Sequence, residues 1–225
     1  MRATELIAHL RKKGTERNRE GMKRFGINVE HATGVSVTEL RRLAKHIGTH
    51  QELSIDLWNS EVHEARILAS MLGDPKRVSE RQMEEWVEEF DSWDVCDQVC
   101  SNLFDKTPFA HKKAMEWSSR SEEFVKRAGF VLMACFAIHD KHAKREMFVR
   151  FFPVIVRECR DERNFVKKAV NWALRQIGKR SLSLNKEAIL VCEKIATIDA
   201  PSAKWIASNA KWELESAAVQ KRLTE

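Results

Sequence analysis

The chain has 225 residues, of which 43% are hydrophobic and 32% charged, and this length and balance suit one folded domain or one continuous repeat array. Only 8 glycines and 4 prolines are present, which argues against sandwiches, barrels and doubly wound sheets with their many tight turns. The formal charge of +6 favours a polyanionic partner, although a basic run is more often a solvated helix face.

The five cysteines are odd in number and irregular in spacing, so they do not form a disulfide framework. Each lies among apolar residues of an expected helix, which indicates reduced core residues. The sequence has no signal-type apolar block at its start and no apolar run of about 18 residues. We therefore expect a soluble cytoplasmic protein that does not associate with membranes.

Hydrophobic periodicity predicts helices along most of the chain, and no alternating pattern of useful length indicates a strand. Capping-box spacings at Ser36 to Glu39 and Ser79 to Gln82 mark two helix starts. Gly73-Asp74-Pro75 marks a break, and Pro108 suits a first helical position. The expected helices cover residues 4–25 in one or two pieces, 37–47, 51–58, 61–72, 80–90, 93–104, 108–118, 122–138, 141–158, 163–180, 184–197 and 201–216.

Weak self-similarity recurs at about 40 residues. Arg127-Ala128 is echoed by Lys168-Ala169, and Asn171-Trp172 by Lys211-Trp212. Such a period in an all-helical chain is typical of HEAT-like or armadillo-like helix pairs. We therefore predict an all-α fold, a right-handed superhelical solenoid of HEAT-like antiparallel helix pairs that forms a single domain over residues 1–225, with a concave binding surface.

The stretch from Asp91 to Cys100 is the first candidate site. Asp91 or Ser92 can cap a helix, and a helix starting there places Trp93 and Asp97 one turn apart on one face, which Ser101 extends. An indole beside a carboxylate can hold a cation. The alternative is that Asp97 has no function and is simply a carboxylate near a helix start, where the helix dipole favours it.

Two later stretches add basic and indole groups. The first is Lys126-Arg127-Ala128, and the second runs from Val166 to Arg175 and contains Lys167, Lys168 and Trp172. Either tryptophan can equally be a core residue, and Arg127 can form a surface ion pair with Glu123. Gly129, inside an expected helix, indicates a close approach by another backbone.

Signals for metal or cofactor chemistry are weak. His139 and His142 could face one way on a helix, but no third ligand stands nearby in the sequence. Cys96 and Cys100 have helical spacing that favours core packing. The sequence contains neither a phosphate-binding glycine loop nor a nucleophile elbow, and we expect no metal and no cofactor.

Together these stretches resemble the AlkD-type DNA alkylation repair glycosylases. The resemblance rests on Trp93-Asp94-Val95-Cys96-Asp97, on Lys126-Arg127-Ala128 and on the stretch from Val166 to Arg175, in this order and at similar separations. The all-helical repeat pattern agrees over nearly the whole chain. The family often has an aromatic residue before the first tryptophan and an arginine before the arginine, where this chain has Ser92 and Lys126.

The resemblance implies a HEAT-like solenoid that binds duplex DNA as a monomer. It also implies excision of cationic alkylated purines, 3-methyladenine and 7-methylguanine, by hydrolysis of the N-glycosidic bond without base flipping and without a metal. Asp97 is then the catalytic carboxylate, flanked by Trp93 and Trp172. The expected DNA contacts are Arg127, Lys126, Lys167, Lys168 and Arg175.

Two other interpretations of the sequence remain open. A non-catalytic DNA-binding HEAT relative would have the same groove but release no base. A HEAT-type protein-interaction scaffold would have no salt-sensitive affinity for DNA, and its concave face would be mixed in charge.

Overall fold

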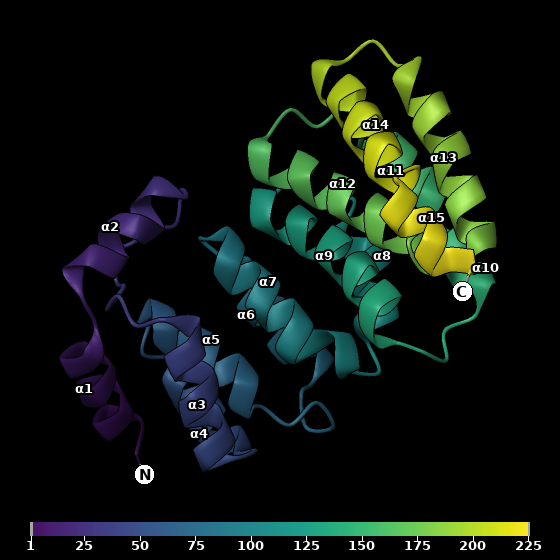
Figure 1. The fold of residues 1–225 in the computed structure, drawn as a ribbon. Coiled ribbons are helices and arrows are strands. Elements are labelled where there is room, and N and C mark those ends of the chain that lie inside the picture. Colours follow the sequence, from purple (N-terminus) through teal and green to yellow (C-terminus); the bar gives the residue numbers. More distant parts are fainter. Residues whose placement is uncertain (1, 225) are drawn as a thin grey trace. The chain divides into compact units, whose positions relative to one another are not determined.

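In the computed structural model, which describes residues 2–224, the helices group into two units, Met1–Pro108 and Phe109–Glu225 (Figure 1). Within the described residues every regular element is a helix. The predicted all-helical fold is therefore confirmed. The expectation of one repeat domain over residues 1–225 stays a prediction.

The described residues of the first unit form seven α-helices and a short 3-10 helix. Its α5 packs against α3, α4 and α7, so that α3, α5 and α7 form one row with α4 behind it, as in HEAT-like pairs. The elements are α1 (Ala3–Lys13), α2 (Glu16–Arg24), α3 (Val37–Ile47), α4 (Gln51–Trp58), α5 (His63–Leu72), α6 (Glu80–Glu88), α7 (Trp93–Asn102) and η1 (Phe104–Lys106).

The second unit repeats this arrangement. Its α9, α12 and α14 pack side by side, while α8 packs on α9 and α13 packs on both α12 and α14 (Figure 1). The elements are α8 (Ala110–Trp117), α9 (Glu123–His139), α10 (Arg145–Val149), α11 (Phe151–Glu158), α12 (Asn164–Gly178), α13 (Leu182–Ala196), α14 (Pro201–Leu214) and α15 (Ala217–Thr224).

Aromatic side chains build the core of each unit. In the first, the rings of Trp58 and Trp86 stack with centroids 4.1 Å apart and planes 5° from parallel. In the second, Phe136, Phe148 and Phe151 form a buried group. All five cysteines are buried and free of disulfides, as the sequence predicts. No helix within residues 2–224 combines the length and apolar character that crossing a membrane requires.

Several helices differ from the sequence prediction at their ends by one or two residues, and larger differences occur in the second half of the chain. The helix expected over 141–158 is two helices separated at Arg150, because Pro153 cannot donate to the carbonyl four residues earlier and its ring crowds that carbonyl. The helix expected to open at Pro108 begins at Ala110. The expected helices end at residue 216, so they do not include the last helix, α15.

Gly129 has the close neighbour that the sequence indicates. A Cβ on this residue would lie 2.5 Å from the backbone nitrogen of Ser118 and 3.0 Å from the carbonyl oxygen of Ala114. The end of α8 therefore rests directly on the backbone of α9 at this point. The absence of a side chain at Gly129 sets the spacing between the two helices.

Candidate functional site

Helix α7 separates its polar side chains from its apolar ones. Trp93 and Asp97 are partly exposed and lie four residues apart, so their side chains share one face of the helix. The residues that alternate with them and are buried are Val95, Cys96, Val99 and Cys100. The expected common face of Trp93 and Asp97 is therefore confirmed.

The start of α7 is fixed by a distant loop. Ser92 occupies the N-cap position, as the sequence allows, but its side chain makes no capping bond. Its Oγ instead accepts a hydrogen bond from the main-chain N–H of Asn28 at 2.8 Å, and the Asn28 amide donates to Asp91 Oδ2 at 2.7 Å. The capping role expected of Ser92 is wrong, because the buried hydroxyl has a tertiary partner.

The same loop holds the indole. Trp93 Nε1 donates to the main-chain carbonyl of Phe25 at 3.0 Å. Phe25 follows α2, whose first turn carries Arg17 and whose last turn carries Lys23 and Arg24, and its own ring is 73% exposed. A basic helix thus ends beside the candidate tryptophan, within the first unit.

A buried histidine lies behind α7. His63 on α5 has a side chain only 3% exposed, and its Nε2 lies 2.8 Å from Asp94 Oδ2. Burial alone would lower the pKa of His63, but the hydrogen bond and charge of Asp94, with Glu64 and Asp91, outweigh it and raise that pKa. The carboxylate next to Trp93 on α7 is therefore held from within the core.

A small cavity opens at this end of α7. It has a volume of about 200 Å³ and lies wholly within the first unit. Its lining residues are Asn28, His31, Glu61, His63, Arg66, Asp91 and Val95. His63 and Asn28 carry no local sequence signal, because their roles depend on partners more than 30 residues away.

Trp172 lies on α12 in the second unit and is partly exposed. With the Gln176 amide oriented to suit its neighbours, its oxygen accepts from Trp172 Nε1 at 2.9 Å and from Lys179 Nζ at 3.1 Å. A plain core position for Trp172 is excluded by its exposure. Its proximity to Trp93 and Asp97 stays a prediction.

Lys126 and Arg127 both bind partners within the second unit. Lys126 Nζ lies 2.6 Å from Glu158 and 3.4 Å from Asp161. Arg127 is only 5% exposed and donates to the carbonyl of Phe165 at 2.6 Å. Arg127 is therefore buried rather than on the surface, and it fixes the first turn of α12. Direct contact of either residue with DNA stays a prediction.

The cations of α12 differ in exposure. Lys168 is exposed, and Lys167 Nζ lies 5.5 Å from the ring centre of Trp205. Arg175 forms an ion pair with Glu213 on α14. Of these three, Lys168 is the most accessible to a phosphate, and the DNA-binding roles of all three stay predictions.

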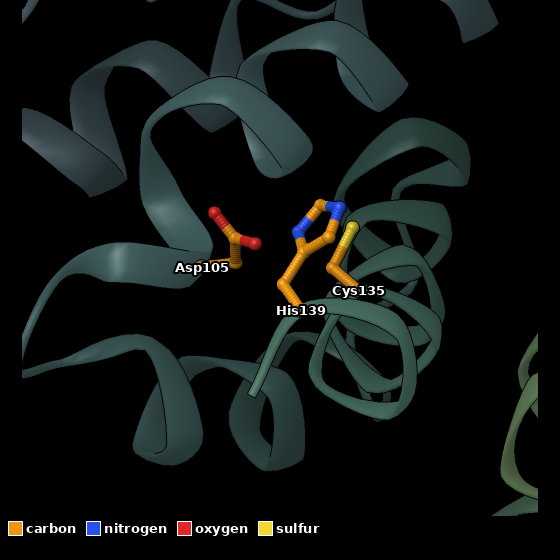
Figure 2. Close-up of side chains that lie close together, drawn as sticks. All are labelled: Asp105, Cys135 and His139. Atoms are coloured by element: carbon orange, nitrogen blue, oxygen red, sulfur yellow. The ribbon is translucent and has the colours of Figure 1, made fainter. Parts of the chain in front are cut away.

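The histidine pair considered from the sequence does not share a helix face. Helix α9 ends at His139, so His142 lies beyond it in a turn. Cys135 and His139 lie one turn apart on α9 and point to the same side (Figure 2). The helical spacing assumed for a His139–His142 metal site is therefore wrong.

Comparison with known proteins bears on this arrangement. The sequence model of a family described as "DNA alkylation repair enzyme" matches residues 6–203. No curated protein matches the chain. A similar solved structure is described as "a new family of proteins related to the HEAT-like repeat DNA glycosylases with affinity for branched DNA structures". It is 19% identical, covers 99% of this chain and 96% of its own, and has a TM-score of 0.83. At that identity it establishes the HEAT-like fold.

Proposed function

The chain belongs to the DNA alkylation repair enzyme family, and from that premise we propose that it is a DNA glycosylase acting as a monomer on duplex DNA. Its substrates are cationic alkylated purines, 3-methyladenine and 7-methylguanine. It hydrolyses the N-glycosidic bond without flipping the base into a pocket, and its chemistry uses no metal and no cofactor.

The observation that carries the proposal is the pairing of Trp93 and Asp97 on α7. Both side chains are on the accessible face of a helix whose other face is buried. The indole is held by Phe25, and the adjacent Asp94 is held by His63. A carboxylate and a π face presented side by side on a rigid helix suit the stabilisation of positive charge.

The reaction needs little acid catalysis, because a purine alkylated at N3 or N7 is already cationic and leaves as a neutral base. As the bond breaks, the deoxyribose acquires oxocarbenium character. Asp97 stabilises that charge and orients the attacking water, a preorganised electrostatic contribution. Trp93 and Trp172 flank the sugar, with their π faces toward the developing charge.

Basic residues of the second unit hold the DNA backbone in this proposal. Lys168 and Lys167 contact phosphates. Arg175, Lys126 and Arg127 are the further DNA-binding residues in this proposal. Support comes from their spacing on α9 and α12 and from the exposure of Lys168. The Arg127 bond to Phe165 gives the start of α12 a fixed position. Binding is expected to weaken steeply as salt rises, because phosphate contacts release counterions.

The test is release of 7-methylguanine and 3-methyladenine from methylated duplex under single-turnover conditions. Asp97→Asn is expected to slow release by about 10²–10³-fold, the range seen when one preorganised charge-stabilising group is removed. Asp56→Asn is the matched control, because Asp56 is an exposed aspartate of α4 in the same unit. Equal rates for Asp97→Asn and the parent would remove Asp97 from the mechanism.

A second candidate is a non-catalytic DNA-binding protein. It is favoured by the similar structure whose description gives affinity for branched DNA. The wild-type protein separates the two functions, because a binder shifts duplex and branched DNA in a gel but liberates no base from methylated DNA. Base release above the spontaneous rate would exclude this candidate.

A further inference from the structure

A second concave feature lies within the second unit, at the far end of α12 from its first turn. It is a cavity of about 670 Å³. The ends of α9 and α12, the start of α13 and a residue of α15 border it. Its charged lining residues are all basic, namely Lys141, Arg145, Lys179, Arg180 and Arg222.

Acidic residues outside the lining offset only part of this charge. Arg145 pairs with Glu187 on α13, and Lys179 Nζ lies 2.5 Å from Glu213. Glu213 also forms an ion pair with Arg175, so its single charge is shared between two cations. The cavity therefore keeps a positive excess.

The other three lining cations donate to neutral carbonyls. Lys141 Nζ lies 2.7 Å from the carbonyl oxygen of Ile138, and Arg222 lies 3.1 Å from that of Lys179. Arg180 donates to two carbonyls at 3.2 Å each and lies over the Phe148 ring. Arg180 thus joins helix ends, while Lys141 and Arg222 are exposed and keep donors for a ligand.

The start of α13 adds to this positive field. Ser181, which lines the cavity, is the N-cap of this 15-residue helix, and its Oγ accepts from the amide of Leu184 at 3.3 Å. The positive end of the helix dipole therefore faces the same space as the cations. The cavity, its cations and the start of α13 therefore all favour the binding of an anion.

The cavity is connected to Trp172 through Gln176, which lines it. The Gln176 amide accepts from both Trp172 and Lys179. Lys179 follows Trp172 by seven residues, which corresponds to roughly 10 Å along α12 at about 1.5 Å per residue. A DNA strand that runs parallel to α12, with a phosphate every 3.4 Å or so of helix axis, would cover this distance with roughly three nucleotides.

We propose that this cavity binds a backbone phosphate of the DNA strand, about three nucleotides from the excised base. The position relative to the base rests on the proposed glycosylase function. The binding of a phosphodiester does not, because it depends only on the cations and the start of α13.

The first experiment measures affinity for undamaged duplex as a function of salt. The variant is Lys141→Gln with Arg222→Gln, which leaves the bridging Arg180 intact. Loss of one phosphate contact is expected to weaken binding severalfold and to reduce the slope of log K against log salt by about 1. The matched control is Lys186→Gln with Lys194→Gln, two exposed cations of α13 that do not line the cavity.

The second experiment uses the unmodified protein, so it does not depend on how the variant folds. Acetylation of Lys141, followed by mass spectrometry, is expected to be suppressed by duplex DNA, while acetylation of Lys194 is unchanged. Single methylphosphonates are scanned along a duplex that carries one alkylated purine. The positions that weaken binding are expected to include one about three nucleotides from that purine, in addition to those contacted by Lys167 and Lys168. Inorganic pyrophosphate is the probe for a free-anion site.

The outcomes separate the two proposals. An unchanged salt slope, full acetylation of Lys141 in the complex or a methylphosphonate scan with no effect about three nucleotides from the alkylated purine would overturn the phosphate cavity. Tight binding of pyrophosphate, together with acetylation of Lys141 that DNA does not change, would assign the cavity to a free anion instead. A reduced salt slope without base release would leave the cavity standing and refute the glycosylase.

Discussion

The indole N–H of Trp93 donates to the main-chain carbonyl of Phe25, 68 positions earlier in the chain, at 3.0 Å. The acceptor belongs to the backbone, so the bond does not depend on which side chain stands at position 25. Asn28 and Ser92 hold the same loop on the same helix start. The orientation of the candidate tryptophan is therefore set by the end of a basic helix near the N-terminus.

Ser92→Ala should destabilise the first unit, because it leaves the amide of Asn28 without its acceptor in a partly buried place. The expected loss is about 1–3 kcal/mol in the free energy of unfolding, measured by urea denaturation. Ser101→Ala on the same helix is the control and should stay within about 0.5 kcal/mol. Equal effects would show that the Asn28 bond contributes nothing.

Glu64→Gln should lower the free energy of unfolding by about 3 kcal/mol. The Glu64 side chain is buried, and it accepts from the amides of Thr33, Gly34 and Val35 at 2.7, 2.6 and 3.3 Å. Glutamine removes the charge and turns an NH₂ group toward these donors. The loop from residue 27 to residue 35 should also lose protection from hydrogen exchange.

The control for this change is Glu20→Gln, at an exposed position of α2, where the carboxylate forms only a long ion pair of 3.9 Å with Arg24. It should change the free energy of unfolding by no more than about 0.5 kcal/mol. A Glu64→Gln protein as stable as this control would mean that the loop does not need the carboxylate.

His63 should make stability depend on pH. Its pKa is raised above the ordinary 6.5, because the hydrogen bond and charge of Asp94 outweigh the opposing effect of burial. The folded protein then binds a proton more tightly than the unfolded chain. The stabilisation is complete below about pH 6.5 and is lost as the pH rises through the folded pKa.

The measurement is the difference in unfolding free energy between the parent and His63→Gln across pH 5 to 8.5. We expect it to be largest, about 2 kcal/mol, at the acidic end and to shrink as the pH rises. His46→Gln, at an exposed histidine of α3, is the matched control. A difference that is constant with pH, or that grows with it, would contradict the ion pair.

Gly129→Ala and Gly21→Ala should have opposite signs. At Gly129 a Cβ would meet the Ser118 backbone at 2.5 Å, so α8 and α9 must separate, at a cost of about 1–3 kcal/mol. At Gly21 in α2 nothing lies within 4 Å of the added atom, and alanine should stabilise by roughly 0.5–1 kcal/mol through helix propensity. Thermal melts of the two variants would check this, and two shifts of the same sign would refute it.

The sequence by itself determined the helices, their HEAT-like pairing and the shared face of Trp93 and Asp97. These features follow from local rules, because side chains four residues apart on a helix must lie on one side of it. The close contact at Gly129 was also predictable, since a residue without a side chain inside an apolar helix indicates close approach by another backbone. Family membership followed from the order of three short motifs.

Only the tertiary structure decided what each polar group contacts. Ser92 binds the amide of Asn28 rather than capping its own helix, and Arg127 is buried against the carbonyl of Phe165. Such partners stand 64 and 38 positions away in sequence. A hydrogen bond at that separation depends on how loops and helix ends pack, and helical periodicity carries no information about this packing.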